Sequence, residues 1–426
     1  MHAYASEDPV FLAMNRRGQR ETNGALGDFC VRCHAPMALR EGKTSDGLNL
    51  EDVPAKLKGV TCFFCHSVDQ VNGEHNAPLR LANDLAMRGS LAKPIETTAH
   101  ATVNSPLHNR DQLESASLCG SCHDVQTGHG ANIERTFAEW KESVFSQPPL
   151  GATCGQCHMA QSKVEQPAAL VENAPLRRTH SHTFAAVDLA LTDFPEKEAQ
   201  RSEVQSLLDT SLQSAVCVAR TPTGTQLRVV LDNIAAGHSF PSGATQDRRL
   251  WVETQSFADG GLIASSGIVA ADQNETSVAD PNFWLMRDCL FAPDGGAVDM
   301  FWEAASFAGN TLPAQATFDK LDPRYYLNHV MQTWPLPALP DRVTMKVWLR
   351  PMGLGVLRGL VESGDLDEGV LAALPTFQLG QTVEWTAASA TQTFVDSEGN
   401  PVSCLSLTNL KVQTTLAASL PRRCSP

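Results

Sequence analysis

Cys30-Val31-Arg32-Cys33-His34 is the first of four copies of one five-residue pattern in this chain of 426 residues. The other copies are Cys62-Phe63-Phe64-Cys65-His66, Cys119-Gly120-Ser121-Cys122-His123 and Cys154-Gly155-Gln156-Cys157-His158. With 12 cysteines and 13 histidines in the chain, chance would produce such a string about 0.01 times. Four copies therefore reflect a chemical requirement and not the composition.

The Cys-x-x-Cys-His spacing is the attachment signature of a c-type haem. Two thiols form thioether bonds to one porphyrin, and the adjacent histidine becomes the proximal ligand of its iron. Zinc knuckles and redox dithiols also use Cys-x-x-Cys, but neither explains a histidine after every second cysteine. We therefore predict four covalently bound haems c. The predicted thioether residues are Cys30, Cys33, Cys62, Cys65, Cys119, Cys122, Cys154 and Cys157, and the predicted proximal ligands are His34, His66, His123 and His158.

Composition limits the partners and the compartment. The formal net charge of −14 argues against a nucleic-acid partner. No apolar run is long enough to predict a membrane span. Because haem c is attached outside the cytoplasm, we expect the protein in the periplasm, outside the cell or at the cell surface. Residues 1–20 carry no export signal, so we expect that signal to have been removed or to lie upstream of Met1, with a further haem motif there as one option.

The character of the sequence changes near residue 199. All four motifs lie in residues 1–198, where short helices and irregular connections are expected to wrap the haems. Beyond that point, runs such as 250–257 and 343–349 alternate as strands do, and turn residues separate them. We expect an α+β chain of two domains: a mostly helical and irregular, haem-cored tetrahaem domain (1–198, lacking its native N-terminus) and an antiparallel, β-sandwich-like domain (199–426). Local helices are expected at 79–88, 133–145 and 354–362.

Nine histidines lie outside the motifs, and seven of them fall within the first 182 residues. A second imidazole on an iron gives a six-coordinate, low-spin haem that suits electron relay. These nine histidines are therefore candidate distal ligands. His129, His180 and His329 favour surface or packing roles instead.

Residues 1–195 resemble the multihaem cytochrome c552/c554 family over their whole length. The resemblance rests on the strings Gly59-Val60-Thr61-Cys62, Ser105-Pro106-Leu107-His108, Leu118-Cys119-Gly120-Ser121-Cys122-His123-Asp124, Glu134-Arg135-Thr136-Phe137-x-Glu139-Trp140 and His180-Ser181-His182-x-Phe184. It implies that His182 and His2 are the leading distal ligands. His100 and His108 follow, and His75 comes last; these three keep an alternative role at the surface or on haem propionates.

One histidine of the second half is a further candidate ligand. The string Asn233-Ile-Ala-Ala-Gly237-His238-Ser-Phe240-Pro241-Ser242-Gly243 resembles loops that recur in β-domains attached to multihaem cytochromes. The resemblance implies that His238 serves a haem. A structural turn, in which the imidazole bonds nearby backbone, is the alternative.

Two classes of function stay open. The first is an electron carrier with mainly bis-histidine haems, working between a donor and an acceptor protein, other cytochromes among them. The second is an oxidoreductase acting on a small nitrogen or sulfur compound, of the hydroxylamine or nitrite type, at a five-coordinate haem. The surplus of histidines favours the carrier, and we assign no catalytic residue. The domain at 199–426 has no evident use in a simple carrier.

Four cysteines stand outside the motifs: Cys217, Cys289, Cys404 and Cys424. In an oxidising compartment three disulfide pairings are open to them, and buried free thiols are an alternative. The Cys404–Cys424 pairing would close the shortest loop.

Overall fold

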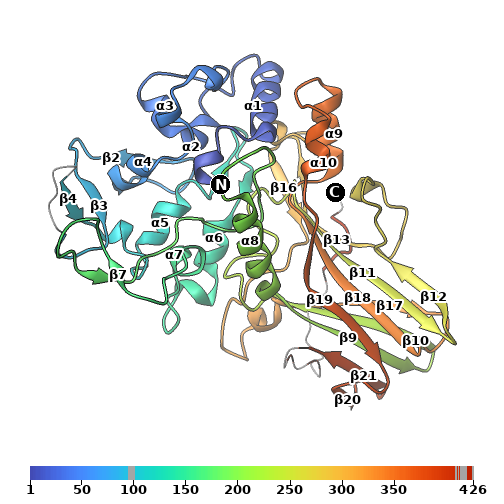
Figure 1. The fold of residues 1–426 in the computed structure, drawn as a ribbon. Helices are drawn as coiled ribbons and strands as arrows, with labels where there is room; N and C mark the ends of the chain where they lie inside the picture. Colours follow the sequence, from blue (N-terminus) through green and yellow to red (C-terminus); the bar gives the residue numbers. More distant parts are fainter. Residues whose placement is uncertain (95–100, 408–409, 411, 413–419, 425–426) are drawn as a thin grey trace.

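The computed structural model describes residues 1–94, 101–407, 410, 412 and 420–424. It is a mixed α+β chain: short helices and irregular connections dominate the N-terminal part, and antiparallel sheets dominate the remainder (Figure 1). Among the described residues, no helix combines the length and the apolar character needed to cross a membrane.

The N-terminal part is built from short elements. Its helices are α1 (Pro9–Glu21), α2 (Val31–His34), α3 (Pro36–Arg40), α4 (Cys62–Ser67), α5 (Ser115–Gly120), α6 (Thr136–Glu142) and α7 (Cys154–His158). Its strands pair as β1 (Val68–Val71) with β2 (Leu79–Leu81), β3 (Met87–Gly89) with β4 (Thr102–Asn104), β5 (Val125–Gln126) with β6 (Asn132–Glu134), and β7 (Gln166–Pro167) with β8 (Leu176–Arg177). The 3-10 turns of the chain are η1 (His2–Tyr4), η2 (Leu50–Asp52), η3 (Ala55–Leu57), η4 (Pro106–His108), η5 (Val144–Ser146), η6 (Glu275–Ser277), η7 (Phe301–Glu303) and η8 (Pro323–Tyr326).

Two of the helices expected in this part differ from the prediction. The helix expected at 79–88 is wrong, because Leu79–Leu81 pairs as β2 with the strand that directly follows the second motif. Met87–Gly89 forms β3. The helix expected at 133–145 is shorter, since α6 covers Thr136–Glu142 and the turn η5 follows it.

The second part begins with α8 (Lys197–Ser211) and contains two large antiparallel sheets. The first has the order β17 (His329–Leu336), β10 (Gly224–Asp232), β9 (Gln213–Thr221), β21 (Pro401–Ser406), β20 (Gln392–Val395). The second has the order β12 (Gly261–Ser266), β11 (Arg249–Ala258), β18 (Arg342–Arg350), β19 (Phe377–Thr386), with β13 (Trp284–Met286) also on β11. A smaller sheet has the order β15 (Ala297–Val298), β14 (Asp288–Phe291), β16 (Ser306–Gly309). The strands expected at 250–257 and 343–349 are confirmed as parts of β11 and β18.

The two large sheets share one hydrophobic core. Leu227 and Val229 of one sheet and Leu250 and Val347 of the other belong to the same buried cluster, which Val204 of α8 extends. Alternate residues along the strands point inward, as β18 illustrates. The apolar alternation in the sequence therefore identifies the faces of the two sheets that pack against each other.

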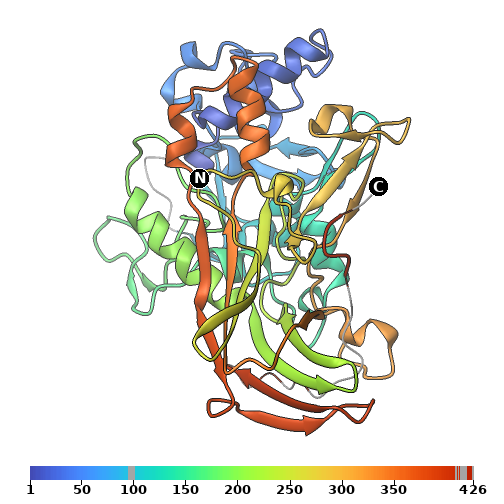
Figure 2. The same cartoon turned by 90° about the vertical axis from the view of Figure 1, so that its right-hand side faces the viewer.

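A second core joins the two parts of the chain. The helix predicted at 354–362 is confirmed as α9 (Leu354–Glu362), which with α10 (Gly369–Ala373) lies beside α1 (Figures 1 and 2). Val10 and Met14 of α1 share a buried cluster with Trp302, Leu357 and Leu360. Residues more than 300 positions apart in the chain are therefore buried from solvent in the same cluster.

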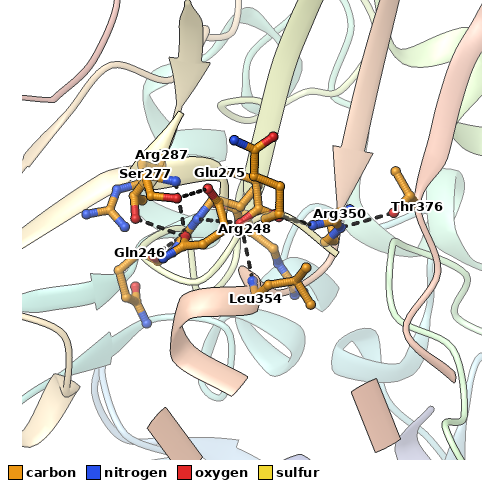
Figure 3. Close-up of polar contacts among 12 residues, drawn as sticks. Gln246, Arg248, Glu275, Ser277, Arg287, Arg350, Leu354 and Thr376 are labelled. Carbon is orange, nitrogen blue, oxygen red and sulfur yellow. Dashed lines mark hydrogen bonds and ion pairs between the residues drawn. The ribbon is translucent and has the colours of Figure 1, made fainter. Parts of the chain in front are cut away.

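A buried ion pair fixes the start of α9 against the second sheet. Arg350, at the end of β18, bonds Glu275 and Thr376, and the backbone N–H of Leu354 donates to the other carboxylate oxygen of Glu275 at 3.2 Å (Figure 3). Glu275 is fully buried. Because both of its oxygens have partners, the burial of this charge is compensated.

The disulfides differ from the pairing with the shortest loop. Cys217 faces Cys404 across β9 and β21, and Cys289 of β14 joins Cys424. Cys404 lies in the interior of a strand whose neighbour carries Cys217, so the sheet register selects its partner. Loop length in the sequence carries no information about that register.

Candidate functional site

Each of the four motifs lies on or at the end of a short helix. The second and fourth motifs open α4 and α7, and Thr61 and Thr153 cap these helices by accepting from backbone N–H groups. The first motif forms α2, and the third begins at the end of α5. In a helical turn, side chains three positions apart share one face. Both thiols of a motif are therefore directed to the same side.

The third motif lies between the other motifs. Cys122 lies close enough to Cys33 of the first motif, and Cys119 close enough to Cys154 of the fourth, for their thiols to interact electrostatically. Cys65 of the second motif interacts electrostatically with both Cys119 and Cys122. The motifs thus form one cluster with the third at its centre.

The four motif histidines have one feature in common: Nδ1 has a hydrogen-bond acceptor. The Nδ1 atoms of His34 and His158 lie 3.1 and 2.8 Å from the carbonyl oxygens of Ala5 and Ala185, and His66 bonds that of Arg88. The His123 Nδ1 lies 2.9 Å from Oε1 of Glu134. A carbonyl or carboxylate oxygen only accepts, so Nδ1 carries a proton in each of the four, and in the neutral imidazole Nε2 then has the free lone pair. This is the state of an imidazole that binds iron through Nε2.

Three of these histidines face a second imidazole. The ring centroids are 6.2 Å apart for His2 and His123, 6.3 Å for His66 and His182, and 6.4 Å for His158 and His238. Two imidazoles that bind one metal from opposite sides, with bonds of ~2.0 Å, have their centroids roughly 6.3 Å apart. The donor sets thus fit the axial positions of three haem irons.

His34 has a different neighbour. Phe11 of α1 stacks on its ring at 4.1 Å with an interplanar angle of 6°. Among the described residues no histidine ring faces His34. Within the described residues, the first motif therefore presents one imidazole and no second imidazole that faces it.

The remaining histidines have other partners or lie apart. The ring centroid of His108 is 5.5 Å from that of His66, but Nε2 of His108 bonds the carbonyl oxygen of Cys65 at 2.7 Å. His75 donates from Nδ1 to Oδ1 of Asp124 at 3.0 Å and faces none of the motif histidines. His100 lies outside the described residues. His129 is exposed, His180 contacts Gln161, and His329 is buried beside Asp232 in β17, the packing role expected for it.

Burial keeps most of the site histidines neutral. It lowers the pKa of His2 to about 3, and it lowers the pKa of His34, His158 and His238 below the ordinary value of 6.5. His123 differs: desolvation opposes its protonation, but the hydrogen bond and charge of Glu134, together with Cys122 and Cys119, outweigh this and raise the pKa of His123 to about 9. Neutral imidazoles have the lone pair that iron requires.

The loop that carries His238 is bonded on both sides. Asn233, which is buried, donates from Nδ2 to the carbonyl oxygen of His238 at 2.8 Å. Glu139 of α6 accepts from the Ser239 N–H at 3.2 Å and from the Ser242 hydroxyl at 2.7 Å. Thr136 accepts from the Gly243 N–H at 3.1 Å, and the positive φ of 83° explains a glycine there. A helix between two motifs thus positions the loop.

The chemistry of the site comes from pairs of donors. Within the described ranges, no group of three or more His, Cys, Asp or Glu side chains is arranged to hold a bare metal ion. What converges is pairs of thiols and pairs of imidazoles. That donor set fits a planar macrocycle with covalent anchors at its edge and ligands above and below its centre.

Comparison with known proteins gives a likeness of fold. No family model matches the chain, and no curated protein matches it. Among solved structures, the chain is similar to a penta-heme cytochrome c552 from Thermochromatium tepidum, with 17% identity and a TM-score of 0.56. The similarity covers 84% of this chain and 83% of that one. The likeness concerns the fold.

Two carboxylates of the site were not predicted as functional residues. Glu134 and Glu139 belong to the string that supports the family resemblance, yet neither was expected to contact a ligand histidine or its loop. A carboxylate at a short distance after a Cys-x-x-Cys-His motif is the available signal for Glu134. Nothing local identifies Glu139, because its partners are 100 positions away in the chain.

Proposed function

We propose that this chain is a multihaem c-type cytochrome that carries electrons between redox partners. Four haems c are attached at the Cys-x-x-Cys-His motifs, and three of their irons have two histidine ligands. The observation that carries the proposal is the spacing of three imidazole pairs at 6.2 to 6.4 Å, each with its motif histidine bonded through Nδ1. The proposed ligand pairs are His2 with His123, His66 with His182, and His158 with His238.

Each group of residues has a defined role in this proposal. Haem iron supplies one-electron redox chemistry when it is bound. The thiols anchor the macrocycle edge, and the acceptors of Nδ1 fix the plane of each imidazole. Two histidine ligands are suited to both oxidation states, so little rearrangement accompanies electron transfer. The thiol contacts of the third motif favour short distances between neighbouring redox centres.

The organisation of the whole chain follows the same proposal. Residues 1–198 form the tetrahaem domain, and residues 199–426 form a β-sandwich-like domain that supplies His238. Because haem c is attached outside the cytoplasm, the protein functions in the periplasm or at the cell surface. Its partners are an electron donor and an electron acceptor protein. The penta-heme cytochrome of similar fold supports this class of partner.

The test is a count of haems combined with their spin states. The intact protein, expressed with the haem maturation machinery, is expected to carry four porphyrins per chain by denaturing mass spectrometry. Electron paramagnetic resonance of the oxidised protein is expected to show mainly low-spin iron. Fewer than four covalent porphyrins, or a majority of high-spin iron, would overturn the proposal.

The ligand role proposed for His238 has its own test. His238→Ala is expected to convert one of the four irons to high spin, because its imidazole is the second ligand of the iron at His158. His129→Ala, at an exposed histidine, is the control and is expected to leave all spectra unchanged. A folded His238→Ala protein with unchanged low-spin signals would show that this histidine is a structural turn residue.

A second candidate function rests on the first motif. Because the described residues offer His34 no opposing histidine, its iron would keep an open position for a small ligand such as nitrite or hydroxylamine. In that case one high-spin signal appears in the wild-type protein and changes when either compound is added. Turnover of such a compound would identify an oxidoreductase, whereas four low-spin irons would exclude it.

A further inference from the structure

The acceptors of the four Nδ1 atoms are not chemically equal. His34, His66 and His158 each bond a neutral backbone carbonyl. His123 bonds the Glu134 carboxylate at 2.9 Å. One motif in four is therefore paired with a charged acceptor.

The fold holds Glu134 at a fixed distance from His123. Glu134 is the last residue of β6 and pairs with Val125 of β5, the strand that follows the third motif after one residue. Its side chain is 20% exposed. Among the described residues, no arginine or lysine forms an ion pair with Glu134. Arg248 interacts electrostatically with Glu134 but forms its ion pair with Asp188, so the contact between Glu134 and His123 is the direct hydrogen bond.

A carboxylate acceptor changes the imidazole as a ligand. It draws the Nδ1 proton more strongly than a carbonyl does, which leaves more electron density at Nε2. A more basic axial ligand stabilises the oxidised, more positively charged iron relative to the reduced one. The iron that binds His123 should therefore be harder to reduce than it would be with a neutral acceptor.

We propose that Glu134 selectively lowers the reduction potential of the haem held by His123. This inference rests on the proposed function. The third motif lies at the centre of the cluster, in contact with the first and fourth motifs. The haem with the lowered potential is thus the central redox centre of the relay. An electron is transferred through this haem and does not reside on it.

The test is a spectroelectrochemical titration of the complete haem-loaded protein with Glu134→Gln. The amide keeps an acceptor oxygen for Nδ1 and removes the charge. We expect one of four midpoint potentials to rise, with the ratio of oxidised to reduced iron at a fixed potential changing about tenfold, or ~59 mV. The other three potentials should stay unchanged.

Two further variants separate the outcomes. Glu142→Gln removes an exposed charge on α6 that bonds none of the motif histidines and should shift no potential. Glu134→Asp keeps the charge with a shorter reach and should shift the same haem upward by less than Glu134→Gln. It also provides the measurement if the glutamine variant fails to take up haem.

The results distinguish the inference from the function on which it rests. Four bound haems with unchanged potentials in Glu134→Gln would overturn the inference alone. An equal shift of all four potentials would also overturn it, because that result describes a long-range charge effect. A wild-type chain without four covalent haems would overturn the proposed function itself.

Discussion

At the scale of single residues, the hydrogen bonding of Nε2 separates histidines that look alike in sequence. His182 and His108 both have ring centroids near His66, at 6.3 and 5.5 Å. His182 bonds the carbonyl oxygen of His180 through Nδ1, which leaves Nε2 free, whereas Nε2 of His108 bonds Cys65. The accessible nitrogen, and not the shorter distance, determines which of the two can bind iron.

These two histidines give the first prediction. Under the proposed function, His182→Ala removes a ligand and should convert one iron of four to high spin in the oxidised spectrum. His108→Ala should leave all spin states unchanged and lower the free energy of unfolding by about 0.5 to 1.5 kcal/mol, because the Cys65 carbonyl, which also accepts from the Val68 N–H, loses one of its two donors. The opposite result, a high-spin iron in His108→Ala alone, would exchange their roles.

Asp247 shows how burial affects a residue away from the motifs. It lies in the segment that leads into β11, two residues before Arg249. Burial raises the pKa of Asp247 to about 6, although Arg249, Arg248 and Arg287 oppose the shift. The folded protein therefore binds a proton at Asp247 more strongly than the unfolded chain does.

The second prediction follows from that difference. The pKa of Asp247 in the folded protein is above its ordinary value of 3.8. The carboxyl therefore contributes its full stabilisation only below pH 3.8, and this contribution is lost as the pH rises through about 6. Asp247→Asn removes this dependence. The stability of the variant relative to wild type, measured by urea unfolding, should therefore increase between pH 4 and pH 6 and stay level above. A difference that is constant over this range would contradict the raised pKa.

At the scale of elements, α6 connects the motifs to the second part of the chain. Glu139 bonds the loop at Ser239 and Ser242, and Arg135 forms an ion pair with the buried Asp288 of β14 at 2.7 Å. Thr136 and Ser242 join through their hydroxyls at 2.8 Å. One face of a seven-residue helix therefore carries the contacts that position the His238 loop.

This arrangement gives the third prediction. Glu139→Ala leaves the Ser239 N–H and the Ser242 hydroxyl without their acceptor, which should cost about 1 to 3 kcal/mol and raise the high-spin fraction of one iron. Glu139→Gln keeps an acceptor oxygen and should restore both the stability and the low-spin spectrum. Spin states would be measured in the oxidised protein. If both variants lose stability and neither changes a spin state, Glu139 has only a structural role.

Elements with a strong local signal could be predicted from the sequence. The apolar spacing of residues 354–362 and the alternation of 250–257 agree with α9 and β11. Residues 79–88 could not, since Leu79–Leu81 pairs with β1 and Met87–Gly89 pairs with β4, and this β-pairing outweighs local propensity. The four motifs needed no tertiary information. The resemblance also names His2 and His238 as candidate ligands, but which motif histidine each one faces depends on the tertiary structure, because they come from the start of the chain and from the second part.

At the scale of the whole molecule, the buried cluster of α1, Trp302 and α9 joins the two parts. A polar contact supports it: Arg20 bonds both carboxylate oxygens of Asp365. Cores that cross a proposed domain boundary make separate unfolding unfavourable, since either part would expose apolar surface.

The fourth prediction is a single unfolding transition. Absorption of the haems and fluorescence of the tryptophans should report the same midpoint in urea. Leu357→Ala, in the shared core, should lower both midpoints together by an amount equivalent to about 2 to 5 kcal/mol. Leu262→Ala, at a residue that is 57% exposed on β12, is the control and should shift neither. Two separate midpoints in the wild-type protein would show that the parts are independent.

The pair formed by His158 and His238 has a consequence for biogenesis. Under the proposed function, Cys154 and Cys157 anchor the fourth haem within the N-terminal part, whereas its second ligand, His238, belongs to the β-rich part. Attachment at the fourth motif does not require this second histidine, which reaches the haem only when the β-rich part folds and its loop docks on α6. The spectrum of that one haem then shows whether a newly made molecule has acquired the second histidine ligand. A chain that ends before residue 238 would be recognised by an iron at the fourth motif that lacks this ligand.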